Sequence, residues 1–183
     1  MMKCCALLRG INVGGNNLIK MADLKACFEA MGFGETRTYI ASGNVIFESD
    51  EKDLETLSQT IERGLSKEFG YKACVVVVPY MILSKVVRKA PKGFGEEPER
   101  YRYDVIFLRA PMTAAEAIKS VEARDGVDEA WQGDDVLYFS RIIKKAAQSK
   151  LPKLASKPAY KSMTVRNWNT ATKLFSLLSE PDR

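Results

Sequence analysis

The segment Leu7–Asn17, which reads Leu-Leu-Arg-Gly-Ile-Asn-Val-Gly-Gly-Asn-Asn, has residue types that could bind an anion. Glycine and asparagine tolerate left-handed backbone conformations, so such a loop can turn several backbone N–H groups toward one ligand. Arg9 adds a positive charge where the loop begins. We therefore predict that this loop binds a phosphate group or another anion. A loop that needs the same residues only to turn the chain is the alternative. The predicted ligand-binding residues of the loop are Arg9, Gly10, Asn12, Gly14 and Gly15.

A turn at Ser42, Gly43 and Asn44 joins two runs that are rich in strand-forming residues. A hairpin turn would by itself account for these residue types. Their position makes them candidate binding residues, because the fold predicted below brings this turn to the same sheet edge as the loop. We therefore include Ser42, Gly43 and Asn44 among the predicted ligand-binding residues.

The motif Arg-Asn-Trp-Asn-Thr at 166–170 precedes the last helical pattern of the chain. A helix N-terminus beside an arginine attracts anions, because its N–H groups and the helix dipole both favour negative charge. An N-cap at Asn167 followed by a buried Trp168 would explain part of the motif without any ligand. That alternative gives the other three residues no role. We predict that the ligand is bound by Arg166, Asn167, Asn169 and Thr170.

The positive charge of the chain is concentrated toward its C-terminal end. The net charge is +5, and no acidic residue occurs between Asp135 and Glu180. An uninterrupted set of basic residues predicts an electropositive face, whose natural partners are phosphorylated small molecules or nucleic acid. We include Lys150 in the predicted binding site. The basic residues of this interval are Arg141, Lys144, Lys145, Lys150, Lys153, Lys157, Lys161, Arg166 and Lys173.

The chain contains no histidine, which excludes Ser-His-Asp and Cys-His catalysis and any histidine-ligated metal. The acidic residues show no metal-ligand spacing, so we expect no metal site. The sequence identifies neither a cofactor nor a catalytic residue. The cysteines also lack metal-ligand spacing, and we predict that they are buried thiols without disulfides. They are Cys4, Cys5, Cys27 and Cys74.

No apolar run approaches the roughly 20 residues that are needed to cross a bilayer. The N-terminus lacks the pattern of a signal peptide, because Lys3 and Arg9 interrupt its apolar stretch. We therefore expect a cytoplasmic protein without a membrane partner. The sequence does not determine the oligomeric state.

Hydrophobic periodicity predicts the element order β-α-β-β-α-β over the first half of the chain. Asp50 is the expected cap of the second helix, and Gly70 is expected to end it. This order is that of a ferredoxin-like fold, or α/β plait, with an antiparallel sheet. The predicted strands cover residues 3–9, 36–41, 45–47 and 73–78, and the predicted helices cover 21–33 and 52–69.

The second half repeats this order. The segment 91–98, with two prolines and two glycines, is the predicted linker between the halves. Thr113 and Glu116 form a capping box for a helix over 114–123. We predict an α+β protein with two tandem ferredoxin-like (α/β-plait) halves, covering residues 1–92 and 93–183, plus a C-terminal helix. The other predicted elements are a short helix after Pro79, strands over 101–108, 127–132, 136–139 and 161–165, and a helix near 149–156.

This topology would bring the candidate residues together. In a plait the first strand lies antiparallel beside the third, so the loop after the first strand meets the turn before the third. Ligand sites form preferentially between domains. We therefore expect one positively charged cleft between the halves, lined by Arg9, Asn12, Asn44, Lys150, Arg166 and Asn169.

Three segments of the sequence resemble the domain-of-unknown-function 1697 family of uncharacterised bacterial proteins. They are Ala6–Gly15, Thr38–Val45 and Arg166–Thr170, and the resemblance runs from the N-terminus to the final helix. A family pattern of Ser-Lys-Leu is also present at Ser149–Leu151, although the segment 142–148 departs from the usual lead-in. The resemblance implies a duplicated α+β fold with ferredoxin-like halves. It implies no activity.

Three functions stay open at this point. The first is a protein that binds a phosphorylated ligand, either a nucleotide or a nucleic acid, at the Gly/Asn-rich loop. The second is an enzyme that acts on a small phosphorylated metabolite without histidine or metal, using arginine and lysine to stabilise charge. The third is a protein-interaction module. Oligonucleotide affinity that falls steeply with salt would favour the first, and stabilisation by one metabolite would favour the second.

Overall fold

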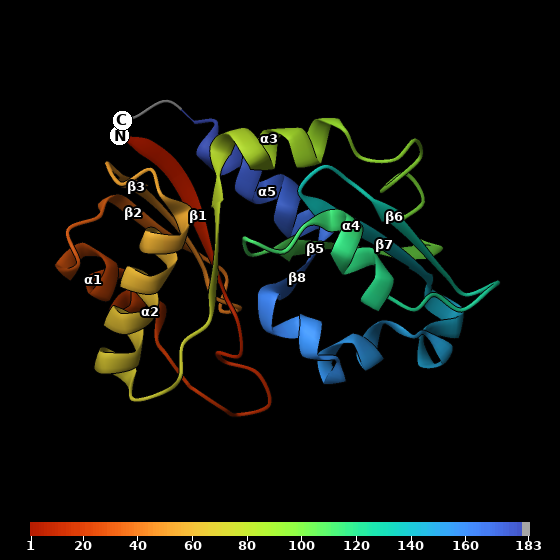
Figure 1. Ribbon diagram of the computed structural model, residues 1–183, viewed down its shortest axis with the longest axis horizontal. Helices are drawn as coiled ribbons and strands as arrows, with labels where there is room; N and C mark the ends of the chain where they lie inside the picture. The colour runs from red at the N-terminus through yellow and green to blue at the C-terminus, as the bar shows by residue number, and fades with distance from the viewer. Residues whose placement is uncertain (181–183) are drawn as a thin grey trace. The chain divides into compact units, whose positions relative to one another are not determined.

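The computed structural model describes residues 1–180 and is an α+β fold with two four-stranded antiparallel sheets (Figure 1). The chain forms two compact units. The first unit contains Met1–Met81 together with the segment that starts at Leu174, and the second contains Ile82–Lys173. The unit boundaries therefore fall within α3 (Tyr80–Arg88) and α5 (Trp168–Leu178) rather than after residue 92.

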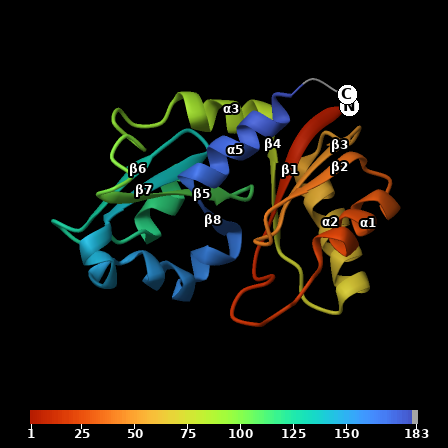
Figure 2. The same cartoon turned by 180° about the vertical axis from the view of Figure 1, so that it is seen from behind.

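The first unit follows the predicted order of strands and helices. Its sheet has the strand order β2-β3-β1-β4, and every neighbouring pair is antiparallel. Cys4, Ala6 and Leu8 alternate along β1 and face a core that also contains buried residues of both helices, so α1 and α2 cover the same face of the sheet (Figure 2). The elements are β1 (Met2–Leu8), α1 (Met21–Ala30), β2 (Gly34–Tyr39), β3 (Asn44–Ser49), α2 (Leu54–Phe69) and β4 (Val75–Pro79).

The predicted cap of α2 was wrong. The helix is capped by Asp53, whose Oδ2 accepts a hydrogen bond from the N–H of Thr56 at 2.8 Å. Asp50 lies before the helix, where the carboxylate of Glu51 accepts from the N–H of Asp53 and holds the chain in a turn. The other end is as expected, since Gly70 adopts a left-handed conformation with φ +67°.

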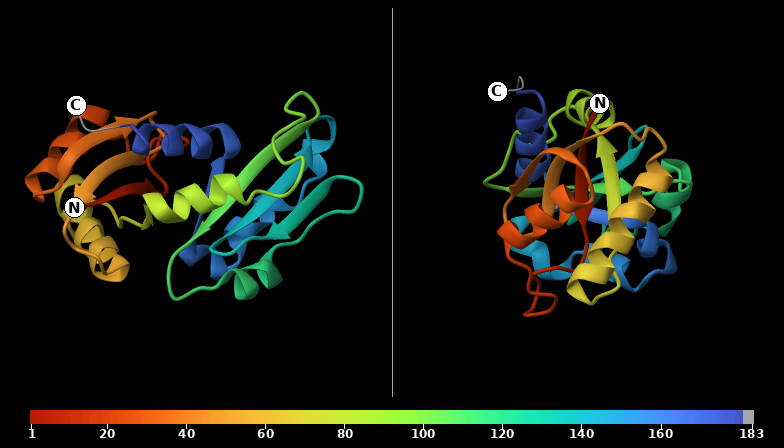
Figure 3. Two further views of the ribbon diagram at one scale, coloured as in Figure 1. Left: turned by 90° about the horizontal axis from the view of Figure 1, so that it is seen from above. Right: turned by 90° about the vertical axis from the view of Figure 1, so that its left-hand side faces the viewer.

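The second unit repeats the strand arrangement, with the order β6-β7-β5-β8 and antiparallel neighbours throughout. Ile106, Leu137 and Phe139 form a core with α4 and with the segment after β7, and Figure 3 shows these elements on the same side of the sheet. The elements are β5 (Tyr101–Leu108), α4 (Ala114–Ala117), β6 (Asp128–Gln132), β7 (Val136–Ile142), β8 (Met163–Asn167) and four 3-10 helices at Ile118–Ser120, Ile143–Gln148, Leu151–Ser156 and Pro158–Ser162.

Two helices of this unit are less regular than the periodicity suggested. The capping box of Thr113 and Glu116 is present, but α4 ends at Ala117 and continues only as a 3-10 turn to Ser120. The predicted helix near 149–156 is a 3-10 helix that begins at Leu151. Pro152 lies in the first turn of this 3-10 helix, where proline is tolerated, and Pro158 follows its end, where the missing N–H prevents an α-helical ladder from continuing.

The segment 91–98 is packed into the second unit, contrary to its predicted role as a linker. The ring of Phe94 is buried and makes edge-to-face contacts with four other rings at centroid distances of 4.8–5.8 Å. Its partners are Tyr103, Trp131, Tyr138 and Trp168. Proline and glycine shape this loop around a hydrophobic anchor, so their presence did not indicate a flexible connection.

The cysteines are as predicted. Cys4, Cys5 and Cys27 are buried, Cys74 is half-buried, and none of these four thiols forms a disulfide. Within residues 1–180, no helix has the length and apolar character needed to cross a membrane.

Candidate functional site

The loop after β1 is a small hairpin that extends past the end of the first sheet (Figure 1). Val13 and Asn16 pair as an isolated antiparallel bridge, and the N–H of Asn16 donates to the carbonyl of Val13 at 3.0 Å. Between them Gly14 and Gly15 have φ values of +59° and +77°. Positive φ at both central residues is the requirement of a type I′ turn, so the two glycines are needed to form the hairpin itself.

The asparagines of this loop hold it in place. Asn12 has φ +52°, and its Nδ2 donates to the carbonyls of Ile19 at 3.0 Å and Ala41 at 2.9 Å. Its Oδ1 accepts from the N–H of Ile19 at 2.8 Å. The Nδ2 of Asn17 donates to the carbonyl of Gly10 at 2.8 Å. These bonds give the asparagines a structural role that does not require a ligand.

The turn at 42–44 lies beside this loop, which confirms that the two meet at one edge of the sheet. The N–H of Leu8 donates to the carbonyl of Gly43 at 2.8 Å. Gly43 has φ +82°, and a Cβ there would collide with Ile11 and Leu8. Asn44 is fully buried, and its Nδ2 donates to the carbonyl of Tyr39 and to the hydroxyl of Ser42.

The motif at 166–170 belongs to the second unit, where β8 leads into α5. Asn167 caps the helix, because its Oδ1 accepts from the N–H of Thr170 at 2.8 Å. Arg166 is buried on β8, and its guanidinium donates to the hydroxyl of Thr164 and to the carbonyl of Val165. Asn169 is exposed and Thr170 is buried. The expectation that this motif and the loop residues line one cleft stays a prediction.

Lys150 is part of a basic group that also contains Arg124 and Lys153. The Oδ2 of Asp128 accepts from the N–H of Lys150 at 2.9 Å and from the N–H of Arg124 at 3.0 Å. One carboxylate oxygen therefore holds two cationic residues from distant segments side by side. A hydrogen bond and repulsion from Lys153, together with repulsion from Arg124, lower the pKa of Lys150. We call Arg124, Lys150 and Lys153 the basic group.

Charged side chains on three neighbouring strands include Asp128, the residue that holds the basic group. Asp128 on β6 is the register partner of Arg141 on β7, and Arg141 is 3.4 Å from the carboxylate of Asp104 on β5. Burial raises the pKa of Asp104, and the positive charge of Arg141 acts in the opposite direction. Asp128 is therefore fixed both by its backbone partners and by the strand pairing.

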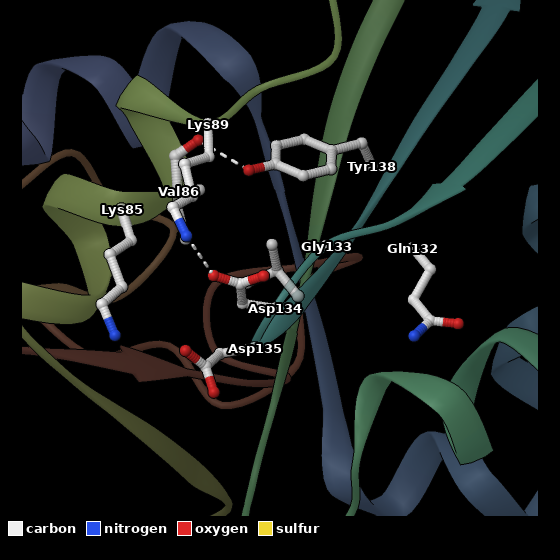
Figure 4. A pocket seen from close by; sticks show the side chains of 9 residues that line it. Lys85, Val86, Lys89, Gln132, Gly133, Asp134, Asp135 and Tyr138 are labelled. Atoms are coloured by element: carbon white, nitrogen blue, oxygen red, sulfur yellow. Dashed lines mark hydrogen bonds and ion pairs between the residues drawn. The ribbon is translucent and has the colours of Figure 1, made fainter.

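The second unit contains at least two hollows. The first, of about 180 Å³, lies between α3 and the turn that joins β6 to β7 (Figure 4). Lys89 reaches Asp134 at 2.7 Å, and the hydroxyl of Tyr138 donates to the carbonyl of Val86. Lys85 and Asp135 complete a balanced set of two positive and two negative charges around it. This balance does not favour an anionic ligand.

The second hollow, of about 220 Å³, lies where β5 and α5 begin. Asn167 and Asn169, both predicted as ligand-binding residues, contribute to it together with aromatic rings. We call it the aromatic hollow. Its lining residues are Pro98, Tyr101, Arg102, Tyr103, Ile143, Asn167, Trp168 and Asn169.

The sequence analysis missed several residues of the basic group and of the aromatic hollow. Arg124 and Asp128 were not considered, because nothing in the sequence brings 124 and 128 next to 150. The stretch Tyr101-Arg102-Tyr103 did offer a signal, since aromatic residues interleaved with a basic one can bind nucleic acid. In the part of the chain that the structure covers, no cluster of three or more His, Cys, Asp or Glu residues could hold a metal.

Comparison with protein families agrees with the resemblance seen in the sequence. Residues 1–138 match the family described as "Protein of unknown function (DUF1697)". The chain belongs to this family. The matched residues end before the Ser-Lys-Leu segment and the motif at 166–170, so the family match is shorter than the resemblance suggested.

Comparison with solved structures extends over the whole chain. A conserved bacterial protein from Streptococcus pneumoniae is similar with a TM-score of 0.83 and 22% sequence identity, and the match covers 98% of this chain and 99% of that one. Similarity at this level of identity concerns the fold alone. No curated protein matches the chain.

Proposed function

We propose that this protein binds a phosphorylated ligand, and that the basic group of the second unit contacts its phosphates. The observation that carries the proposal is the anchoring of two cationic residues by one buried carboxylate. Because the Oδ2 of Asp128 holds the N–H groups of Arg124 and Lys150, both side chains start from adjacent points of the backbone. Crowded cations repel one another, and a bound polyanion would relieve that repulsion.

The charges around the basic group favour a ligand with more than one negative charge. Glu122, an acidic neighbour of Lys150, is engaged in an ion pair with Lys157 at 2.7 Å. A hydrogen bond from Lys153 and the positive charges of Lys153 and Arg124 lower the pKa of Lys150, and the charge of Glu122 acts in the opposite direction. A diphosphate, a nucleotide or a nucleic acid backbone fits this field better than a monoanion does.

Two wider parts of the hypothesis belong to the same proposal. Each sheet has the order second-third-first-fourth strand within its unit, which supports two ferredoxin-like halves related by duplication. The loop at 10–17 stays a predicted second contact for the ligand, and a cytoplasmic location stays an expectation. The hydrogen bonds of the basic group make it the stronger candidate.

Calorimetric titration of the full chain with pyrophosphate tests the proposal. We expect saturable binding that weakens about tenfold or more when Lys150 and Lys153 are changed to Gln, the scale of a lost charged hydrogen bond. Changing both Lys67 and Lys72 to Gln is the matched control, since it removes the same two charges from exposed positions in the first unit. Equal affinity of all variants, or no binding at low salt, would contradict the proposal.

A parallel titration with a single-stranded oligonucleotide separates the two sources of phosphate. Binding to a nucleic acid backbone should fall steeply as salt is raised, because each phosphate contact releases a counterion. A ligand that binds as a small molecule should show a shallow dependence on salt. The comparison decides which of the two classes the basic group serves.

A further inference from the structure

We propose that the aromatic hollow is a binding site for a flat nitrogen heterocycle of the kind found in a nucleobase. Its volume of about 220 Å³ is smaller than the 300–1,000 Å³ of sites for drug-sized ligands, and suits a single ring system. None of its lining residues belongs to the basic group. The proposal therefore goes beyond phosphate binding and can fail or succeed independently.

The back wall of the hollow is rigid. The rings of Trp168 and Tyr103 both pack edge-to-face on Phe94, at centroid distances of 5.2 Å and 4.8 Å. Gly95 has φ +87° and lies so close to the indole of Trp168 that a Cβ there would collide with it. The hydroxyl of Tyr103 accepts from the N–H of Glu97 at 3.2 Å. A fixed aromatic wall offers a stacking surface that needs no reordering when a ligand binds.

Tyr101 supplies a second aromatic surface. The guanidinium of Arg100 lies 5.0 Å from the centroid of its ring, and Arg100 itself does not line the hollow. Tyr101 is half-buried, so its ring is accessible to a ligand from outside.

Polar groups at the hollow match the edge of a base. The Oδ1 of Asn167 is used to cap α5, so a ligand would meet its Nδ2 group as a donor. Asn169 is exposed and offers both a donor and an acceptor, and the exposed Arg102 adds donors with a positive charge. Ring nitrogens and exocyclic groups of a base can satisfy these partners, whereas the phenyl ring of a peptide side chain cannot. The observations therefore favour a base over a peptide.

The test uses adenosine, which carries a base but no phosphate. The only tryptophans of the chain, Trp131 and Trp168, both belong to the second unit, so fluorescence quenching reports stacking there. We expect saturable quenching by adenosine, together with a shift of the Trp168 indole N–H and the Asn169 amide signals in NMR spectra. Adenosine monophosphate and a short single strand tell whether the base comes from a free nucleotide or from a nucleic acid.

Two variants keep the test independent of folding. Tyr101→Ala should weaken adenosine binding about five- to a hundredfold, the range measured for the loss of one base–aromatic stack. Asn169→Ala removes an exposed amide, should leave the fold unchanged, and should weaken binding several-fold. Gln59→Ala, which removes an exposed amide from α2 in the first unit, is the matched control and should bind like the parent chain.

The proposal is overturned if adenosine gives no saturable response. It is also overturned if Tyr101→Ala and Asn169→Ala both bind adenosine as the parent does, or if N-acetylphenylalanine amide binds equally well. Loss of pyrophosphate binding with adenosine binding intact would refute only the phosphate site of the basic group. Loss of adenosine binding with pyrophosphate binding intact would refute only the aromatic hollow.

Discussion

Replacing Asp128 tests whether this residue positions the basic group. Asp128 is buried on β6, and its Oδ2 accepts backbone hydrogen bonds from both Arg124 and Lys150. Asp128→Ala removes the single oxygen that accepts both bonds. It also raises the net charge of the chain by one unit, which by itself would strengthen the binding of an anion. Loss of positioning would therefore weaken anion binding, whereas the added positive charge would strengthen it.

The cost to stability can be worked out from these contacts. Hydrogen bonds to a charged group are worth about 1.5–3 kcal/mol each, so the two bonds contribute at most about 3–6 kcal/mol. Part of this is offset, because burial of the carboxylate carries a desolvation cost and, among the described residues, its Oδ1 has no hydrogen-bond partner. We expect a net loss of about 2–4 kcal/mol for Asp128→Ala and about 1–2 kcal/mol for Asp128→Asn, which keeps one oxygen.

Urea unfolding followed by tryptophan fluorescence measures this loss in the second unit, which contains both tryptophans. With a slope of about 2 kcal/mol per M, the midpoint of Asp128→Ala should fall by about 1–2 M. Pyrophosphate affinity should fall about tenfold, equivalent to one lost hydrogen bond, despite the added positive charge.

Asp125→Asn is the matched control, because Asp125 is exposed on the same segment and its loss changes the net charge equally. It should leave the midpoint unchanged and pyrophosphate binding unchanged or slightly tighter. If Asp128→Ala binds pyrophosphate more tightly than the parent, the positioning argument is refuted and only the charge of Asp128 matters. An unchanged unfolding midpoint would show that the two backbone bonds contribute nothing in solution.

Two further predictions concern the first unit. Gly43→Ala should destabilise it by about 2–5 kcal/mol, because φ is +82° and the added methyl would collide with Ile11 and Leu8. Gly10→Ala, with open space around its Cβ, should cost only about 1–2 kcal/mol. Thermal or urea unfolding followed by circular dichroism measures both losses. Similar losses for the two variants would contradict the collision. Burial raises the pKa of Cys4 to about 12, so little of its thiolate, the reactive form, is present at pH 8. A thiol reagent should then label the half-buried Cys74 first in the native protein, and a Cys74→Ser variant that labels as fast as the parent would be inconsistent with this.

Features that depend on neighbouring residues could be predicted from the sequence. Strand and helix order followed from the period of the apolar residues, the capping box from Thr113 and Glu116, and the end of α2 from Gly70. These features depend on residues within a few positions of one another. The meeting of the loop after β1 with the turn at 42–44 was predictable as well, because antiparallel pairing of the first and third strands requires it.

The sequence could not decide what the Gly/Asn-rich loop is for. A ligand cradle and a type I′ turn both require positive φ, so Gly14 and Gly15 are compatible with either. Only the pairing of Val13 with Asn16, and the bonds from Asn12 to Ile19 and Ala41, show that the loop needs these residues for its own structure.

The basic group and the aromatic hollow, which combine residues distant in sequence, could be identified only from the tertiary structure. The basic group depends on Asp128 reaching the backbone of Lys150, and the aromatic hollow depends on Phe94 and Gly95 packing on Trp168. The sequence showed which of these residues were charged or aromatic. Their contacts follow from strand register and side-chain packing between segments far apart in the chain, which no local periodicity encodes.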